Sequence, residues 1–247
     1  PLQSSLASAT ADKIAKRTAS ASIVNTMLFG ILIGNMSIAT ILSGAGMVPS
    51  ILFAVLGARY AGLHGNKESI VAWTRNCIFA NIAIVLLFLI VDPKSIASLG
   101  VSIILYVVLT FICNGFAMCV TTANTAFMGD IIDYELDRSG KYIPAVVIGT
   151  SSLIDKLVSA FSAAIATAAV AMIGYIPTMP QPNDPPTAGV FWMAMFLKYG
   201  LSILGWICTL VAMRFCKLSK ADMVDVQKRI ENRKAQARSA LFEKELH

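Results

Sequence analysis

The stretch Leu99–Met128, LGVSIILYVVLTFICNGFAMCVTTANTAFM, decides the fold class, because it runs for thirty residues without a charged side chain. A helix needs roughly 20 mostly apolar residues to cross a bilayer, so this stretch is long enough to span one. The whole chain is 56% hydrophobic and 14% charged, with a mean hydropathy of +0.70. Soluble domains are about 45–50% apolar and about 25% charged. The composition therefore predicts an all-α, polytopic membrane protein.

Five further apolar runs flank this stretch, which predicts six spans in all. The first run is the least regular, because Asp12, Lys13, Lys16 and Arg17 lie directly upstream of it. Residues 1–216 are expected to form a six-helix transmembrane bundle, and residues 217–247 a cytoplasmic tail. The predicted spans are Ser20–Gly34, Ile38–Ala61, Ile70–Val91, Leu99–Met128, Pro144–Tyr175 and Ala188–Phe215.

Six crossings sort the basic residues to one side of the membrane. Lys and Arg near span ends mark the cytoplasmic side, so both ends of this segment are expected in the cytoplasm of a plasma-membrane protein. The net charge of +6 is explained in the same way and does not indicate a nucleic-acid partner. Lys94 lies alone on one side, and the other holds Lys13, Lys16, Arg17, Arg59, Lys67, Arg75, Arg138, Lys141, Arg214, Lys217 and Lys220.

The tail has the pattern of a short amphipathic helix. Ser219 and Asp222 have the spacing of a capping box. Met223, Val226 and Ile230 follow at helical spacing among charged residues. Two interpretations stay open: the helix lies along the membrane surface, or it is solvated.

Polar residues within the spans are the candidates for function, because a charge in hydrocarbon is expensive. Asp155 and Lys156 lie deep in the fifth span, with Ser152, Ser159 and Ser162 on the same broad face. This stripe is expected to face a water-filled cavity or another helix. Either substrate or ion contact, or an interhelical salt bridge, would explain it.

The fourth and sixth spans carry weaker signals. The fourth has a stripe that includes Thr121 and Asn124, and small polar residues of this kind also serve in plain helix packing. Lys198, in the last span, is expected to extend toward the outer surface rather than to contact a substrate.

The chain carries no motif of an enzyme and none of a metal or cofactor site. A phosphate-binding glycine loop, an HExxH pair and a nucleophile elbow are all lacking. Asp130 and Asp133 belong to an acidic cluster in which Arg138 and Lys141 are interleaved. Charge pairing in a hinge loop, predicted over Asp130–Lys141, is favoured over metal binding.

The stretch Gly129–Lys141, GDIIDYELDRSGK, resembles the loop between the tenth and eleventh helices of the glycoside–pentoside–hexuronide:cation symporters. These melibiose-permease-like proteins belong to the major facilitator superfamily. The resemblance continues through Gly174, Tyr175 and Pro177 and, upstream, through the basic glycine-rich stretch Leu56–Lys67.

The resemblance implies that the chain is the second half of a twelve-helix carrier of a sugar or glycoside, driven by Na⁺ or H⁺. Lys156, Ser152 and Thr121 correspond to family positions near the sugar and the cation, whereas Asp155 replaces an apolar residue and inherits no role. The principal cation ligands would lie in the first, missing half. A lysolipid cargo is an alternative within the broader family, and a non-transporting membrane sensor or scaffold is one outside it.

By this reading, the substrate would contact Lys156, Ser152, Thr121 and Asn124. Cation coupling or gating would involve Asp155, Asp130, Asp133, Arg138 and Lys141.

Overall fold

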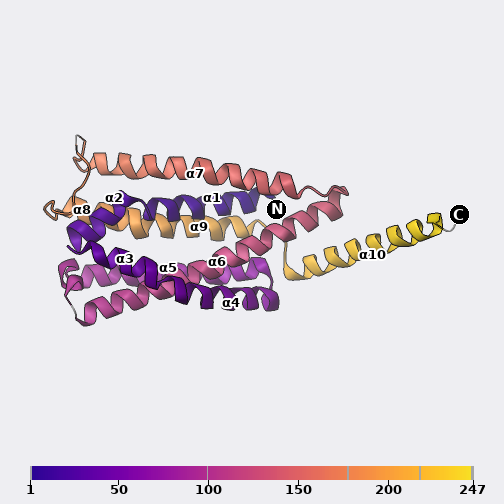
Figure 1. Ribbon diagram of the computed structural model, residues 1–247, viewed down its shortest axis with the longest axis horizontal. Coiled ribbons are helices and arrows are strands. Elements are labelled where there is room, and N and C mark those ends of the chain that lie inside the picture. The colour runs from indigo at the N-terminus through magenta and orange to yellow at the C-terminus, as the bar shows by residue number, and fades with distance from the viewer. Residues whose placement is uncertain (1, 99, 177, 217, 246–247) are drawn as a thin grey trace.

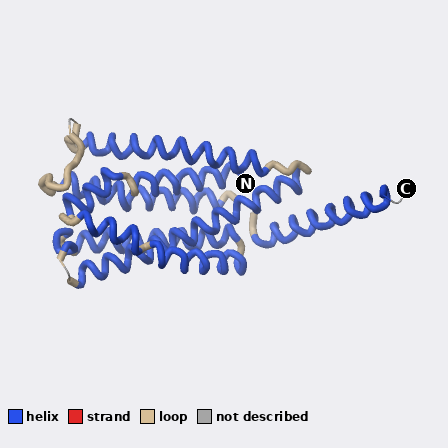
Figure 2. The backbone as a smooth tube through the Cα atoms, viewed as in Figure 1, coloured by secondary structure: helices blue, strands red, loops and turns tan. Residues whose placement is uncertain are grey.

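The computed structural model describes residues 2–98, 100–176, 178–216 and 218–245, the side chains of residues 2–9, 48, 237 and 240–245 excepted. All regular elements within these ranges are helical, which confirms the predicted all-α class (Figure 2). The helices are α1 (Leu2–Ala19), α2 (Ser22–Asn25), η1 (Thr26–Leu32), α3 (Met36–Ala45), α4 (Met47–His64), α5 (Asn66–Ile90), η2 (Pro93–Ala97), α6 (Val101–Ser139), α7 (Pro144–Met172), α8 (Ala188–Met195), η3 (Phe196–Gly200), α9 (Leu201–Arg214) and α10 (Lys220–Glu245).

Most of the predicted spans are present as long apolar helices. Four described helices meet the length and hydropathy of a membrane span: α5, α6, α7 and the continuous run Ala188–Arg214. A fifth is counted if Met36–Ala45 and Pro49–His64, which bend by 45°, form one span. The predicted first span, Ser20–Gly34, is instead a shorter apolar helix, Ser22–Leu32, so the sixth crossing stays a prediction.

The first segment is broken because Ser20 and Ala21 interrupt the helix. Ala21 has φ −59° and ψ 141°, an extended conformation that separates α1 from α2. Beyond the break, η1 is a π-helix over Thr26–Leu32. Short π-helical turns are rare and are often found at functional sites.

The helices pack in the spatial order α7, α1, α9, α5, α6 and α4 (Figure 1). The main hydrophobic core lies between the first segment, α5, α6 and α8–α9, and includes Met27, Leu28, Ile84, Tyr106 and Leu197. Figure 1 shows α7 at the margin of the bundle, where α1 is its principal neighbour. Much of α7 is exposed, including Leu153, Leu157 and Phe161.

The predicted hinge loop Asp130–Lys141 is wrong for most of its length, because α6 continues as helix through Ser139. No proline interrupts the stretch, and the helix ends only at Gly140, whose φ of 69° is the left-handed conformation of a helix C-cap. A helix of 39 residues is about 58 Å long, well beyond a hydrocarbon core of about 30 Å. The last turns of α6 therefore extend past the apolar stretch.

The tail helix α10 leaves the bundle at the end where α1 begins, which we call the basic end (Figure 1). Its first turns pack against the protein: Met223, Val226 and Ile230 are buried in a second core with Phe127 and Met213. Neither predicted environment, the membrane surface or full solvation, describes this half of the helix. The bundle and the tail, predicted to divide between residues 216 and 217, therefore share one hydrophobic core. Residues 231–236, farther along, are exposed.

Polar contacts fix the start and middle of α10. The Asp222 carboxylate accepts hydrogen bonds from the Ser219 amide at 2.9 Å and hydroxyl at 2.7 Å, as the capping-box spacing predicted. These bonds hold the pKa of Asp222 below its usual value. Arg229 pairs with Asp137 of α6 at 2.8 Å, and this contact raises the pKa of Arg229.

Replacement of Val226 by Asp is expected to undock α10, because it places a carboxylate at a position that is only 2% exposed. Loss of the buried side chain should weaken docking by at least about 2 kcal/mol. Limited trypsin digestion of the detergent-solubilised protein should then cut faster at Lys228, Arg229 and Arg233. Val224→Asp is the matched control, because Val224 is 41% exposed on the same helix. Equal cleavage rates in the two variants would contradict the observed docking.

Candidate functional site

A cavity of about 500 Å³ lies between the first segment, α3, α5, α6 and η3–α9. We call it the central cavity. Amides and hydroxyls line it together with aromatic rings, which is the mixed surface typical of small-molecule sites. The polar groups include Asn25, Asn81, Thr110, Asn114 and Ser202, and the aromatic ones are Phe29, Tyr106, Tyr199 and Trp206.

Lys198 points into the protein at the break of the first segment. Its ammonium donates to the Ala19 carbonyl at 3.0 Å and to the Asn25 side-chain oxygen at 2.8 Å. The Asn25 amide nitrogen in turn donates to the Ser20 carbonyl at 3.4 Å. The prediction that Lys198 extends to the outer surface is therefore wrong. The reason is that the interrupted helix offers carbonyl oxygens within reach, which satisfy the ammonium inside the bundle.

Lys198 lies in a local irregularity of its own helix. The turn Phe196–Gly200 is π-helical, while α8 before it and α9 after it are regular α-helices. The contact between Lys198 and Asn25 thus joins two π-helical turns, since Lys198 belongs to η3 and Asn25 directly precedes η1. The Lys198 nitrogen also lies 5.8 Å from the centre of the Phe29 ring, which belongs to η1.

Two tyrosines meet in the wall of the central cavity. The hydroxyls of Tyr106 and Tyr199 are 3.2 Å apart, and both residues are buried. Phe88 contacts both rings, with centroid distances of 5.4 and 6.1 Å. Burial of these amphipathic rings around a paired hydroxyl gives the cavity one firm wall.

A second pocket, also of about 500 Å³, lies nearer the basic end, between α1, α6 and α7. We call it the side pocket. Its lining contains four of the predicted site residues: Thr121, Asn124, Ser152 and Asp155. Charged side chains of α1 form the rest of its polar lining. Lys13 pairs with Asp155 at 3.3 Å, and Arg17 lies 3.8 Å from the same carboxylate.

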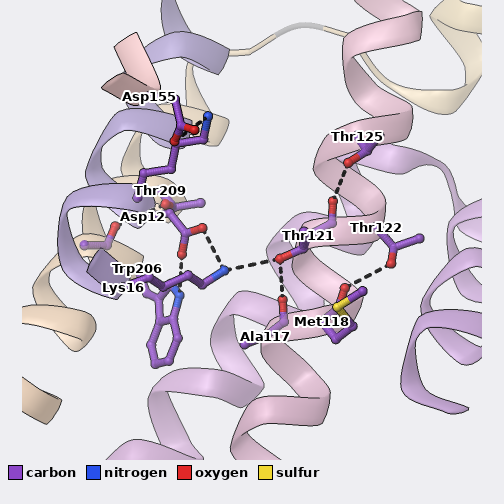
Figure 3. A network of polar contacts seen from close by, with 12 residues as sticks. Asp12, Lys16, Ala117, Met118, Thr121, Thr122, Thr125, Asp155, Trp206 and Thr209 are labelled. Atoms are coloured by element: carbon purple, nitrogen blue, oxygen red, sulfur yellow. Dashed lines mark hydrogen bonds and ion pairs between the residues drawn. The ribbon is translucent and has the colours of Figure 1, made fainter. Parts of the chain in front are cut away.

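The two cavities meet at Lys16, which lines both. Figure 3 shows Lys16 between Asp12 and Thr121, at 2.9 Å from the carboxylate and 3.4 Å from the hydroxyl. The other oxygen of Asp12 accepts a hydrogen bond from the Trp206 indole at 2.9 Å. Asp12 is only 6% exposed, and its carboxylate is held by a cation and an aromatic donor.

Asp155 has the interhelical salt bridge that was one of its two predicted explanations. Thr121 also donates to the Ala117 carbonyl of its own helix at 2.9 Å, so it combines a packing role with its contact to Lys16. Ser152 and Lys156 are exposed. Lys156 forms no ion pair with a residue whose side chain the structure describes, and it does not line the side pocket.

The predicted gating residues of α6 do not form one cluster. Asp130 accepts a hydrogen bond from the Asn66 amide at 2.8 Å, at the start of α5. Asp133 is partly buried nearby. Arg138 pairs within its own helix with Glu135 at 3.5 Å, and Lys141 is exposed after the helix end. The acid that joins α6 to the tail is instead Asp137, through Arg229 and Arg233.

The site residues that sequence reasoning missed include the tyrosine wall of the central cavity, Tyr106 and Tyr199, and two residues in the polar half of the first segment, Asp12 and Lys16. Asp12 and Lys16 make the contact between the two cavities, although their stretch of sequence is too polar to predict a span. Their four-residue spacing, on one face of a helix, was the available signal. Trp206 and Lys198 contact the first segment from the far end of the chain, and no local pattern in the sequence indicates these contacts.

Comparison with known proteins identifies one family. Residues 24–220, more than half of the chain, match the family described as MFS/sugar transport protein. No curated protein and no solved structure gives a significant match. The matched range contains the central cavity's walls from Asn25 to Trp206, while Asp12 and Lys16 lie before it.

Replacement of Asp12 by Ala is expected to destabilise the protein by about 3 kcal/mol, because it leaves the Lys16 ammonium and the Trp206 indole without their partner. The free energy of unfolding in detergent micelles measures this loss. Asp155→Ala is the matched control: its carboxylate is 37% exposed, and exposed pairs are worth about 1 kcal/mol or less. A loss at Asp12 no larger than that at Asp155 would show that the buried pair contributes little.

Proposed function

Because the chain belongs to the MFS/sugar transport protein family of the major facilitator superfamily, we propose that it carries a sugar or glycoside in symport with Na⁺ or H⁺. Membership supports a transporter rather than an enzyme. The finer assignment is our own and rests on one observation: a central cavity that combines hydroxyl and amide groups with aromatic rings. Sugars present hydroxyls at their rim and apolar C–H groups on their faces, so they need both kinds of contact.

The sugar is proposed to lie against the tyrosine wall. Tyr106 and Tyr199 offer hydroxyls, Asn81 and Ser202 offer further hydrogen-bonding groups, and Trp206 offers a ring face. The predicted substrate contacts Thr121, Asn124 and Ser152 then belong to the route between the cavity and the basic end rather than to the cavity itself. Lys156, which is exposed on α7, is proposed to face a second six-helix half that completes the carrier.

The coupling ion is proposed to act at the side pocket, because carboxylates are the ligands that Na⁺ and H⁺ share. Asp155 is partly exposed there between Lys13 and Arg17. Binding of a cation at Asp155 would compete with these two bases and loosen the contact between α7 and α1. Coupling in this sense is reciprocal: the sugar and the cation raise each other's affinity by the same factor.

Alternating access requires that the path from the central cavity to the basic end opens and closes. The Asp12–Lys16 pair stands between the two cavities and is the proposed barrier on this path. The end itself is proposed to face the cytoplasm of a plasma-membrane protein. Asp130, with Asn66, and the tail contacts of Asp137 hold α6 to its neighbours at that end.

Uptake of radiolabelled glycosides by the complete transporter tests the proposal, with Na⁺ and proton gradients varied separately. We expect uptake to require one of the two gradients and to fall in Tyr106→Phe, which removes one hydroxyl of the tyrosine wall. Loss of uptake in Lys156→Ala at normal abundance would support the contact with a second half. No uptake of any glycoside under either gradient would refute sugar symport.

The contact between Asp130 and Asn66 is expected to tune the transport rate. Asp130→Ala and Asn66→Ala should each lower the initial uptake rate severalfold, because each removes the 2.8 Å bond between α6 and α5. If the bond is the cause, the double variant should be no slower than the single ones. Asp133→Ala, one turn on, is the comparison for a general charge effect. Unchanged rates in all four variants would exclude a role for this end of α6.

A further inference from the structure

Lys198 carries a charge inside the bundle that no described carboxylate neutralises. Its ammonium donates to the Ala19 carbonyl and to the Asn25 side-chain oxygen, and both oxygens belong to neutral groups. The Phe29 ring centre lies 5.8 Å from the nitrogen, and a cation–π contact of this length offsets only a small part of the charge. Lys198 takes part in none of the ion pairs among the residues whose side chains the structure describes.

The other charged residue of the central cavity supplies no counter-ion. Lys16 adds a second ammonium to the lining, and Asp12 pairs with it at 2.9 Å. The second Asp12 oxygen accepts the hydrogen bond of the Trp206 indole, so both oxygens of this carboxylate are occupied. The described lining of the cavity contains no Asp or Glu. The cavity therefore has an excess of positive charge, and that excess lies at Lys198.

Such an excess is costly inside a membrane bundle, and the ammonium has the means to reduce it. Charges at this depth are stable when they are paired, and carbonyl or amide dipoles offset only part of the cost. An ammonium has three donor hydrogens, and the bonds to Ala19 and Asn25 use two of them. The third donor belongs to a side chain that lines the cavity.

We propose that the central cavity binds a small monovalent inorganic anion, of the type of chloride, as the counter-ion of Lys198. The third ammonium hydrogen holds the ion by a charge-assisted hydrogen bond. A second donor is present in the same lining: the mutual bond of Tyr106 and Tyr199 uses one of their two hydroxyl hydrogens and leaves the other for an acceptor. The anion leaves the bonds to Ala19 and Asn25 in place, so it is expected to stabilise the break of the first segment.

This inference goes beyond the proposed function, because Lys198 needs a counter-ion whichever solute the carrier moves. A cavity of about 500 Å³ is in the size range of sites for organic molecules, so a single ion leaves most of it free. The anion and a neutral solute can therefore occupy the same cavity together.

A chloride titration of the purified complete transporter in detergent, without sugar, tests the proposal. Sodium methanesulfonate, whose anion is bulkier, replaces sodium chloride at constant ionic strength. An ion that binds only the folded protein raises its unfolding temperature as the ion concentration rises. We expect a saturable rise of about 2 °C or more with chloride, an equal rise with bromide and none with methanesulfonate.

Two variants remove the need for the anion in different ways. Lys198→Gln removes the charge itself. Asn25→Asp places a carboxylate where an amide oxygen now lies 2.8 Å from the ammonium, and so supplies an internal counter-ion. Both variants should lose the chloride-dependent rise, whereas Lys94→Gln, a charge removal at an exposed position, should keep it. Should Lys198→Gln fail to fold, Asn25→Asp still decides, because it keeps the ammonium.

Equal unfolding temperatures of the wild-type protein in chloride and methanesulfonate would overturn the proposal, since the charge would then be met elsewhere in the carrier. A chloride-dependent rise that survives in Asn25→Asp or in Lys198→Gln would also overturn it, by placing the anion at another site. The proposed sugar transport is judged separately. Stabilisation by chloride would stand even if no glycoside were taken up, and glycoside uptake without any stabilisation by chloride would refute this inference alone.

Discussion

The contact between Lys198 and the broken first segment is the constraint on which the architecture depends. Inside a bilayer, backbone carbonyls need protein partners, so a helix break is tolerated only where other groups satisfy it. Here the Lys198 ammonium binds the Ala19 carbonyl, and Asn25 joins the Lys198 side chain to the Ser20 carbonyl. One side chain from the last segment thereby ties down both sides of the break. The break and the cation need each other, since neither would be stable at this depth alone.

This mutual dependence explains where the cavities lie. The break lies where the first segment passes from α1, which packs on α9, to η1, which packs on α8. The central cavity lies beside this break, with Ala19, Ser20 and Asn25 in its wall. Toward the basic end, α1 is a regular helix, and its polar face forms one side of the side pocket through Asp12, Lys13, Lys16 and Arg17. The central cavity thus lies at the break of the first segment, whereas the side pocket lies along the regular helix before it.

Sequence reasoning predicted the helical membrane class, and it found most of the spans, because long apolar runs leave few alternatives to helices in a bilayer. It also found the polar stripes of α6 and α7, and Thr121, Asn124, Ser152 and Asp155 line one pocket. It failed where a residue's partner is distant in the chain. Lys198 has no neighbour in sequence that indicates an inward contact, and its partners are 173 and 179 residues away. Asp12 bonds to Trp206 across 194 residues, which no periodicity reveals.

The basic end shows how local charge patterns mislead when a helix continues past the apolar region. The density of charge over Asp130–Lys141 predicted a loop, yet acidic and basic residues three and four apart also stabilise a helix. The tail helix also holds α6, because Arg229 and Arg233 of α10 form ion pairs with Asp137. At the start of α10, Lys220 donates to the Leu63 carbonyl of α4 at 2.6 Å. Through these bonds α10 connects the ends of α4 and α6. A movement of either helix during transport would therefore have to carry the tail along or break a salt bridge and a hydrogen-bonded helix cap. The tail belongs mechanically to the bundle.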